Sequence, residues 1–179
     1  LGSRYQSWMT IAQGAAIAPG AGDPHDALAH LVIATNAESI AAQQASGLAR
    51  MMAPGVHVDP LGWLGQSVAL YADPDPFWDE MLSTHATDNF LGDNLHRLPV
   101  GLIAEVGSAL KLTAFLTAFR AFVEQSAPGM AAWDTRMHGN QPYVRVGLTE
   151  QARAQGRGGA AAEAAVYYRA TPRALIVSF

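Results

Sequence analysis

The segment from Leu98 to Gly129 constrains the fold more than any other part of the sequence. Its first residues alternate, and Val100, Leu102, Ala104 and Val106 fall on one face, as in a strand with one buried side. After Gly107 the period changes to that of a helix with one apolar stripe. The stripe comprises Leu112, Phe115, Leu116, Phe119, Phe122 and Val123. A strand followed by a long helix that packs on the sheet is therefore expected.

The ends of this helix are also marked in the sequence. Ser108 is a residue type that caps helix N-termini, and Pro128 and Gly129 are typical of a helix end. We expect Phe115, Phe119 and Phe122 to anchor the core against the sheet. Arg120 lies off the stripe, and we expect it to be solvated.

Two further segments repeat the order of strand, turn and helix. Strands are expected at 28–35 and 66–72, in addition to the one near 99–106. Helices are expected at 37–52, capped by Asn36, and from 76 to 81 or 83, where Asp75 caps and Pro76 takes the first helical position. The segments 84–97 and 149–162 are polar or rich in Gly and Ala, and loops are expected there.

The C-terminal part has the pattern of hairpins. Alternating segments at 131–137 and 142–148 flank the turn 138–141, and segments at 165–170 and 174–179 flank a second turn. The predicted fold class is α+β: a mainly antiparallel sheet of three strand–turn–helix units followed by two C-terminal hairpins, with helices packed on one face. Residues 4–179 are expected to form a single domain, and residues 1–3 resemble the remnant of an expression tag.

The charge of the chain is distributed unevenly. Residues 1–95 hold two arginines against ten acids (−8), and residues 96–179 hold nine basic residues against five acids (+4), for a net charge of −4. Either the two halves pack against each other, or the C-terminal half carries a basic binding face. No basic run with interleaved aromatic residues occurs, so nucleic acid is not expected as a partner. No apolar run is long enough to insert into a membrane.

One short motif could carry chemistry. Ser108 and Lys111 have the S-x-x-K spacing of serine acyl-enzymes at the start of a helix. It resembles the first motif of penicillin-recognising enzymes, but no K-T-G follows, and the S-D-N-like 87–89 segment precedes the serine. A capping serine and a solvated lysine are the simpler interpretation. No catalytic residues are therefore expected.

Metal and cofactor sites are not expected either. The chain has no cysteine and six histidines, none in an H-E-x-x-H pattern. The polar groups around His25, His30 and His57 lack a complete ligand spacing. The acids between Asp73 and Glu80 lack the spacing of a calcium loop, and suit a turn followed by a helix start.

Candidate binding residues are large aromatic and basic side chains. The tryptophans serve either as packing residues or as a surface cluster that holds a sugar or a partner. The candidates are Trp63, Trp78 and Trp133, together with Arg136 and Arg145 of the basic half.

Four segments carry a resemblance to a known class of proteins. They are 31–40, 63–78, the Leu110–Leu112 helix region and 167–177. Their patterns are typical of strands, turns and the first turns of helices. They resemble uncharacterised bacterial extracytoplasmic domains of unknown function in large proteins of the planctomycete type. The resemblance implies a periplasmic or cell-surface location and no known activity.

Three functions remain open from the sequence. The first is a non-catalytic structural or protein-interaction module of a larger extracytoplasmic protein, whose partner is a protein or another domain of the same parent chain. The second is a small-ligand-binding domain, with a pocket between the sheet and the 110–125 helix. The third is a serine hydrolase that uses Ser108 and Lys111.

Overall fold

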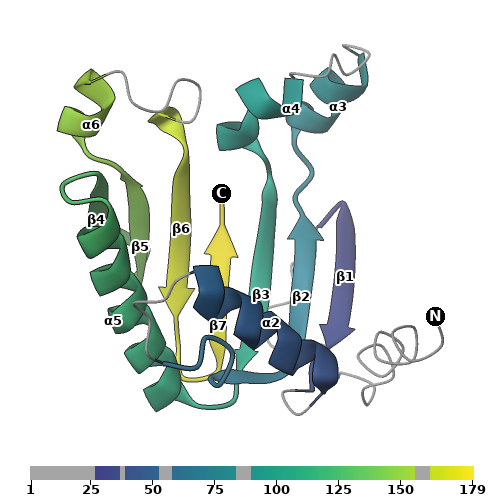
Figure 1. The fold of residues 1–179 in the computed structure, drawn as a ribbon. Coiled ribbons are helices and arrows are strands. Elements are labelled where there is room, and N and C mark those ends of the chain that lie inside the picture. The colour runs from purple at the N-terminus through teal and green to yellow at the C-terminus, as the bar shows by residue number, and fades with distance from the viewer. Residues whose placement is uncertain (1–26, 37–38, 53–57, 84–89, 156–161) are drawn as a thin grey trace.

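The described part of the chain is built around one antiparallel sheet. The computed structural model describes residues 27–36, 39–52, 58–83, 90–155 and 162–179. Their seven strands lie in the order β1-β2-β3-β7-β6-β5-β4 (Figure 1). The strands are β1 (Ala29–Ala34), β2 (Leu64–Ala72), β3 (Val100–Val106), β4 (Ala131–His138), β5 (Gln141–Leu148), β6 (Ala165–Ala170) and β7 (Ala174–Ser178). The predicted α+β class is confirmed.

The two longest helices lie on the same face of this sheet (Figure 1). They are α2 (Ile40–Met52), which follows β1, and α5 (Ala109–Ser126), which follows β3. A third helix, α3 (Pro76–Ser83), follows β2 and lies near one end of the strands. The three strand–turn–helix units and the two C-terminal hairpins, β4–β5 and β6–β7, are therefore present as expected. No helix in the described ranges is long and apolar enough to cross a membrane.

The last strand joins the two halves of the sheet. β7 pairs with β3 on one side, where Ala104 lies opposite Leu175, and with β6 on the other, where Tyr168 lies opposite Val177. The hairpin between β4 and β5 turns at Gly139, whose φ of 56° is in the left-handed region that glycine adopts without strain.

Side-chain caps begin the helices, and one of them differs from the expectation. Ser108 Oγ accepts a hydrogen bond from the Lys111 backbone N–H, and Asp75 Oδ1 accepts one from the Phe77 N–H, as predicted. For α2, Ser39 Oγ accepts from the Ala42 N–H. The prediction that Asn36 caps this helix was wrong. α2 begins at Ile40, and Ser39, the residue directly before it, supplies the side-chain oxygen that accepts the capping hydrogen bond.

Two segments predicted as loops contain short helices. The first holds α4 (Phe90–Asp93) and a 3₁₀ turn, Leu95–Arg97, and the second holds α6 (Glu150–Ala154). Tertiary contacts and local caps explain them, because Phe90 packs 5.6 Å from the ring of Phe77, and Thr149 Oγ1 accepts from the Ala152 N–H. Such short elements carry too little periodicity to be recognised from sequence.

The core lies between α5 and the centre of the sheet. Leu112 is its most deeply buried helical residue, and Phe115 and Leu116 pack beside it. They meet Trp63, Ala104, Val106 and Leu175. Phe119 remains 40% exposed and stacks at 6.0 Å on Phe115, so it does not anchor the core as expected. Periodicity gives the direction of a side chain, but not whether the sheet offers a partner opposite it.

Two leucines of α5 provide a matched test of this core. Leu112 is 2% exposed and Leu110 is 82% exposed. Leu112→Ala should lower the free energy of unfolding by about 2–5 kcal/mol, because it leaves a cavity in the core. Leu110→Ala on the same helix should change it by less than about 0.5 kcal/mol. Urea denaturation measures both, and equal losses would contradict the assigned buried face.

Candidate binding site

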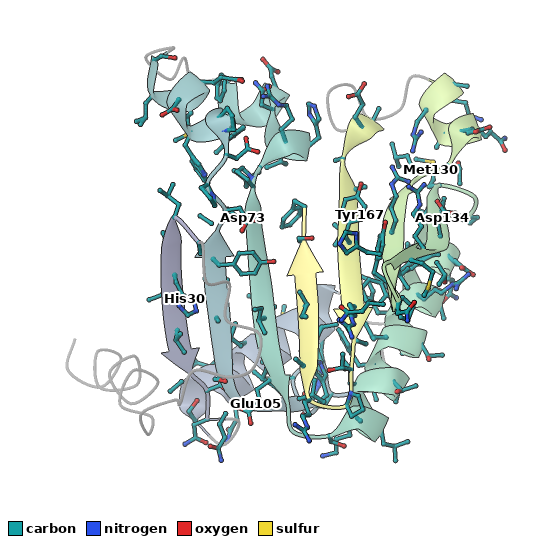
Figure 2. All side chains as sticks on the ribbon, turned by 180° about the vertical axis from the view of Figure 1, so that it is seen from behind. His30, Asp73, Glu105, Met130, Asp134 and Tyr167 are labelled. Atoms are coloured by element: carbon teal, nitrogen blue, oxygen red, sulfur yellow. The ribbon has the colours of Figure 1, made fainter. Side chains whose placement is uncertain are left out.

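The two faces of the sheet differ in how they are covered. α2 and α5 lie on one face, and no described helix lies over the other, which is the one seen in Figure 2. We refer to this second face as the open face. Because side chains alternate along each strand, residues next to the core residues of β3, β6 and β7 point to the open face. The ring of Tyr71 lies there against Gly101, its partner in the register.

Strands β4, β5 and β6 bring a group of basic and aromatic side chains together on the open face. We call this group the arginine–tyrosine cluster: Arg136, Tyr143, Arg145, Tyr167 and Arg169. Arg145 of β5 lies opposite Tyr167 of β6 on one side and opposite Asp134 of β4 on the other. Arg136 of β4 lies opposite Tyr143 of β5. Figure 2 shows Tyr167 and Asp134 on this part of the face. Opposite residues are about 4.5–5.5 Å apart, so the side chains are direct neighbours.

Arg145 lies flat on the sheet at the middle of the cluster. Its side chain is 15% exposed, although it sits on a face that no described helix covers. Gly147, two residues along β5, makes room for it, because a Cβ there would lie 3.0 Å from Arg145 Nη1. The nearest acid is Asp134, whose Oδ2 is 3.8 Å from Nη1. That distance is too long for a hydrogen bond.

The other members of the cluster are held more loosely. Arg169 Nη1 donates a hydrogen bond to Gln141 Oε1, and Arg136 Nη2 lies 3.9 Å from Asp134 Oδ2. The rings of Tyr143 and Tyr167 lie 6.2 Å apart. The three arginines thus face a single aspartate among the described residues, which leaves a positive surface.

The charge asymmetry of the sequence persists in the fold. The halves lie side by side in one sheet, and among ion pairs between described residues one joins them, from Arg97 Nη1 to Glu80 Oε2 at 2.9 Å. The hydrogen bond from Arg97 lowers the pKa of Glu80. This pair lies away from the cluster, so it does not neutralise Arg136, Arg145 or Arg169. The geometry favours the second sequence hypothesis, a basic face on the C-terminal half.

The structure brings together Arg136 and Arg145 of the candidate binding residues, but not the tryptophans. Trp63 is buried, stacks on Phe115, and donates from Nε1 to the Pro60 carbonyl at 2.8 Å. Trp78 donates from Nε1 to the Asp73 carbonyl at 2.9 Å. Both indoles therefore hold together neighbouring segments of the chain.

Trp133 lies on the face covered by α5. The guanidinium carbon of Arg120 is 5.4 Å from the Trp133 ring centre, and Arg120 Nε donates to Glu124 Oε1 at 2.9 Å. Arg120 is exposed, as expected for a residue off the apolar stripe, and its guanidinium in addition has a ring and a carboxylate beside it. Trp133 Nε1 is buried without a hydrogen-bond partner among the described residues.

The sequence did not single out Tyr143, Tyr167 and Arg169. The signal was present in the alternation of each strand, since Tyr143 and Arg145 are two residues apart on β5, and Tyr167 and Arg169 on β6. Only the register between strands shows that these pairs lie next to each other. A basic group with interleaved aromatic residues therefore exists in space, although no run of sequence contains one.

Tyr71 occupies another part of the open face. Burial, and after it the charge of Asp73, raise the pKa of its phenol. Its ring occupies the space that a side chain at Gly101 would fill. Glycine at the second position of β3 is thus explained by the close approach of an aromatic ring.

The other sequence candidates have structural positions or lie outside the described residues. Ser108 Oγ is used in the cap of α5, and the 110–125 helix packs directly on the core through Leu112, Phe115 and Leu116. The described residues contain no group of three or more His, Asp and Glu able to hold a metal. Asp23, His25, Asp26 and His57 lie outside the described ranges.

Comparison of the chain with models of known protein families, with curated proteins and with solved structures gave no match. The arginine–tyrosine cluster is therefore interpreted from its own geometry.

The capping role of Ser108 can be tested by two substitutions. Ser108→Ala should lower the free energy of unfolding by about 1 kcal/mol, because the N-terminal N–H groups of α5 lose an acceptor. Ser108→Asp keeps an acceptor, so its stability should stay near that of the unmodified chain. Equal losses in urea melts, or covalent labelling of Ser108 by a fluorophosphonate, would contradict a purely structural serine.

The contact between Tyr71 and Gly101 gives a second test. Gly101→Ala should cost about 1–3 kcal/mol of stability, because the added methyl group overlaps the ring. The same substitution in a Tyr71→Ala background should cost much less. A double-mutant cycle measured by thermal or urea denaturation gives the difference, and a cost that does not depend on Tyr71 would show another cause.

Proposed function

We propose that the chain is a non-catalytic protein-interaction module and that the arginine–tyrosine cluster is its contact surface. The observation that supports this is the position of the cluster: five basic and aromatic side chains on a sheet face over which no described helix lies. The partner is another domain of the same parent chain or a separate protein.

The residue types favour a protein partner. Arginine and the aromatic residues are enriched at protein interfaces, and Tyr and Arg are among the residues that dominate binding energy. Arg145 lies along the sheet and Arg169 is held by Gln141. Because these side chains are partly fixed before binding, less conformational entropy is lost when a partner orders them.

The other two functions receive less support from the geometry. A ligand pocket between the sheet and the 110–125 helix would need space that Leu112, Phe115 and Leu116 fill. A hydrolase would need Ser108 free in a cleft, whereas its hydroxyl accepts the capping hydrogen bond of α5.

The resemblance to extracytoplasmic bacterial domains is the ground for placing the module in a larger periplasmic or cell-surface protein. In its native host the parent protein should then be degraded by protease added to intact cells or spheroplasts. Protection of the parent protein until the inner membrane is lysed would contradict this location.

Site-specific crosslinking tests the contact surface. A photoreactive phenylalanine derivative in place of Tyr143, within the parent protein in its host, should form a discrete adduct that mass spectrometry assigns to one partner or to another domain. The control places the same group at Leu110, which is exposed on the opposite side of the structure, on α5. Absence of an adduct at Tyr143, or the same adducts at both positions, would contradict the proposal.

A further inference from the structure

The cluster has an excess of positive charge that the described chain leaves unmatched. Arg136, Arg145 and Arg169 share the face with Asp134, and both measured distances to that carboxylate exceed hydrogen-bond length. A surface with more arginines than acids attracts carboxylates or phosphates. The occupant of this surface should therefore carry negative charge.

The state of Arg145 indicates which negative group fits. Its guanidinium makes no hydrogen bond within the described chain, yet the side chain lies against the sheet and over Gly147. A planar guanidinium in a fixed position matches a carboxylate through two parallel hydrogen bonds. The rings of Tyr143 and Tyr167, 6.2 Å apart, lie on the same face of the sheet as Arg145, which suits a peptide segment.

The spacing of the arginines indicates the form of the segment. Arg145 Nη1 lies 3.8 Å and Arg136 Nη2 lies 3.9 Å from the same atom, Asp134 Oδ2, so the two guanidinium groups lie on either side of one carboxylate. Alternate side chains of an extended peptide are separated by roughly 6.5–7 Å, a spacing compatible with two cations placed in this way. Acidic side chains at positions i and i+2 of an extended segment would thus reach both arginines.

We propose that the arginine–tyrosine cluster binds an extended acidic segment of a protein partner, with one carboxylate on Arg145 and a second, two residues away, on Arg136. This inference rests on the proposed function and names the chemistry of the partner. Nucleic acid is the less suitable polyanion. Nucleic-acid affinity rises with the number of phosphates that cations neutralise, and the cluster offers three arginines, which suits a segment with two carboxylates better than a continuous line of phosphates.

A peptide of alternating glutamate and serine, labelled with fluorescein, is the probe for this inference. The full chain, labelled with ¹⁵N, is titrated with the peptide at low salt, and backbone amide shifts should concentrate on β4, β5 and β6. Fluorescence anisotropy should show affinity that falls as salt is raised. A peptide in which lysine replaces glutamate should not bind.

Two variants and a control locate the binding group. Arg145→Gln should weaken peptide binding about tenfold or more, because a charge-assisted bidentate contact is lost. Gly147→Ala leaves every charge in place, but its Cβ displaces the Arg145 guanidinium, so it should also weaken binding. Arg153→Gln removes an exposed arginine of α6, outside the cluster, and should leave affinity unchanged. Far-ultraviolet circular dichroism and urea melts confirm that each variant is folded.

The outcomes separate this inference from the proposed function. Absence of peptide binding, equal losses in Arg145→Gln and Arg153→Gln, or tighter binding of oligothymidylate or heparin to the same strands would overturn the acidic-segment inference. If the crosslinker at Tyr143 still captures a partner, the proposed function stands and only the chemistry of the partner is wrong. If the crosslinker also yields no adduct, both fail.

Discussion

The insertion of β7 between β3 and β6 is the constraint on which the rest of the structure depends. β1, β2 and β3 form one set of neighbouring strands, and β4, β5 and β6 form another. Only β7 pairs with both sets, and it also contributes Leu175 and Val177 to the core beneath α5. α5 and three strands separate β7 from β3 in the sequence, so the pairing of β3 with β7 closes a long stretch of chain. Such long-range closure costs loop entropy that packing in the core must offset.

The same closure determines what the open face carries. On β5 and β6 the residues on the helix-covered face, such as Val144 and Tyr168, alternate with Tyr143, Arg145 and Tyr167 on the open face. A shift of the register by one residue would turn the arginines toward α5 and the valines toward solvent. Burial on one side of the sheet therefore fixes the arrangement of the cluster on the other. The packing of the covered face is thus sufficient to order the surface that we propose for binding.

The elements of this fold could be predicted from sequence, but their lateral order could not. Alternation and caps identify β3, α5, the hairpin at Gly139, and the roles of Ser108 and Asp75, because those signals are local. The place of β7 between β3 and β6 depends on contacts between distant residues, and alternation alone does not encode it. The cluster was missed for the same reason: Arg136, Arg145 and Arg169 come from three strands, and their proximity is a property of the register.

The cluster is also where the sheet departs from the choices that stability alone would favour. Glycine within a strand is unfavourable, because it packs no side chain and loses more backbone entropy on folding than other residues. Gly147 accepts that cost beneath Arg145, whose side chain is 15% exposed and whose guanidinium makes no hydrogen bond in the described chain. At Gly101 the ring of Tyr71 fills the space that a side chain would occupy, and its packing there offsets the cost of a glycine in the strand. At Gly147 the Arg145 guanidinium lies where a side chain would be and offsets the cost in the same way. The conflict that remains is at Arg145, which lies along the sheet with its closest carboxylate, Asp134, 3.8 Å away. Local conflicts of this kind are expected where a surface serves binding, which is the role that we propose for the cluster.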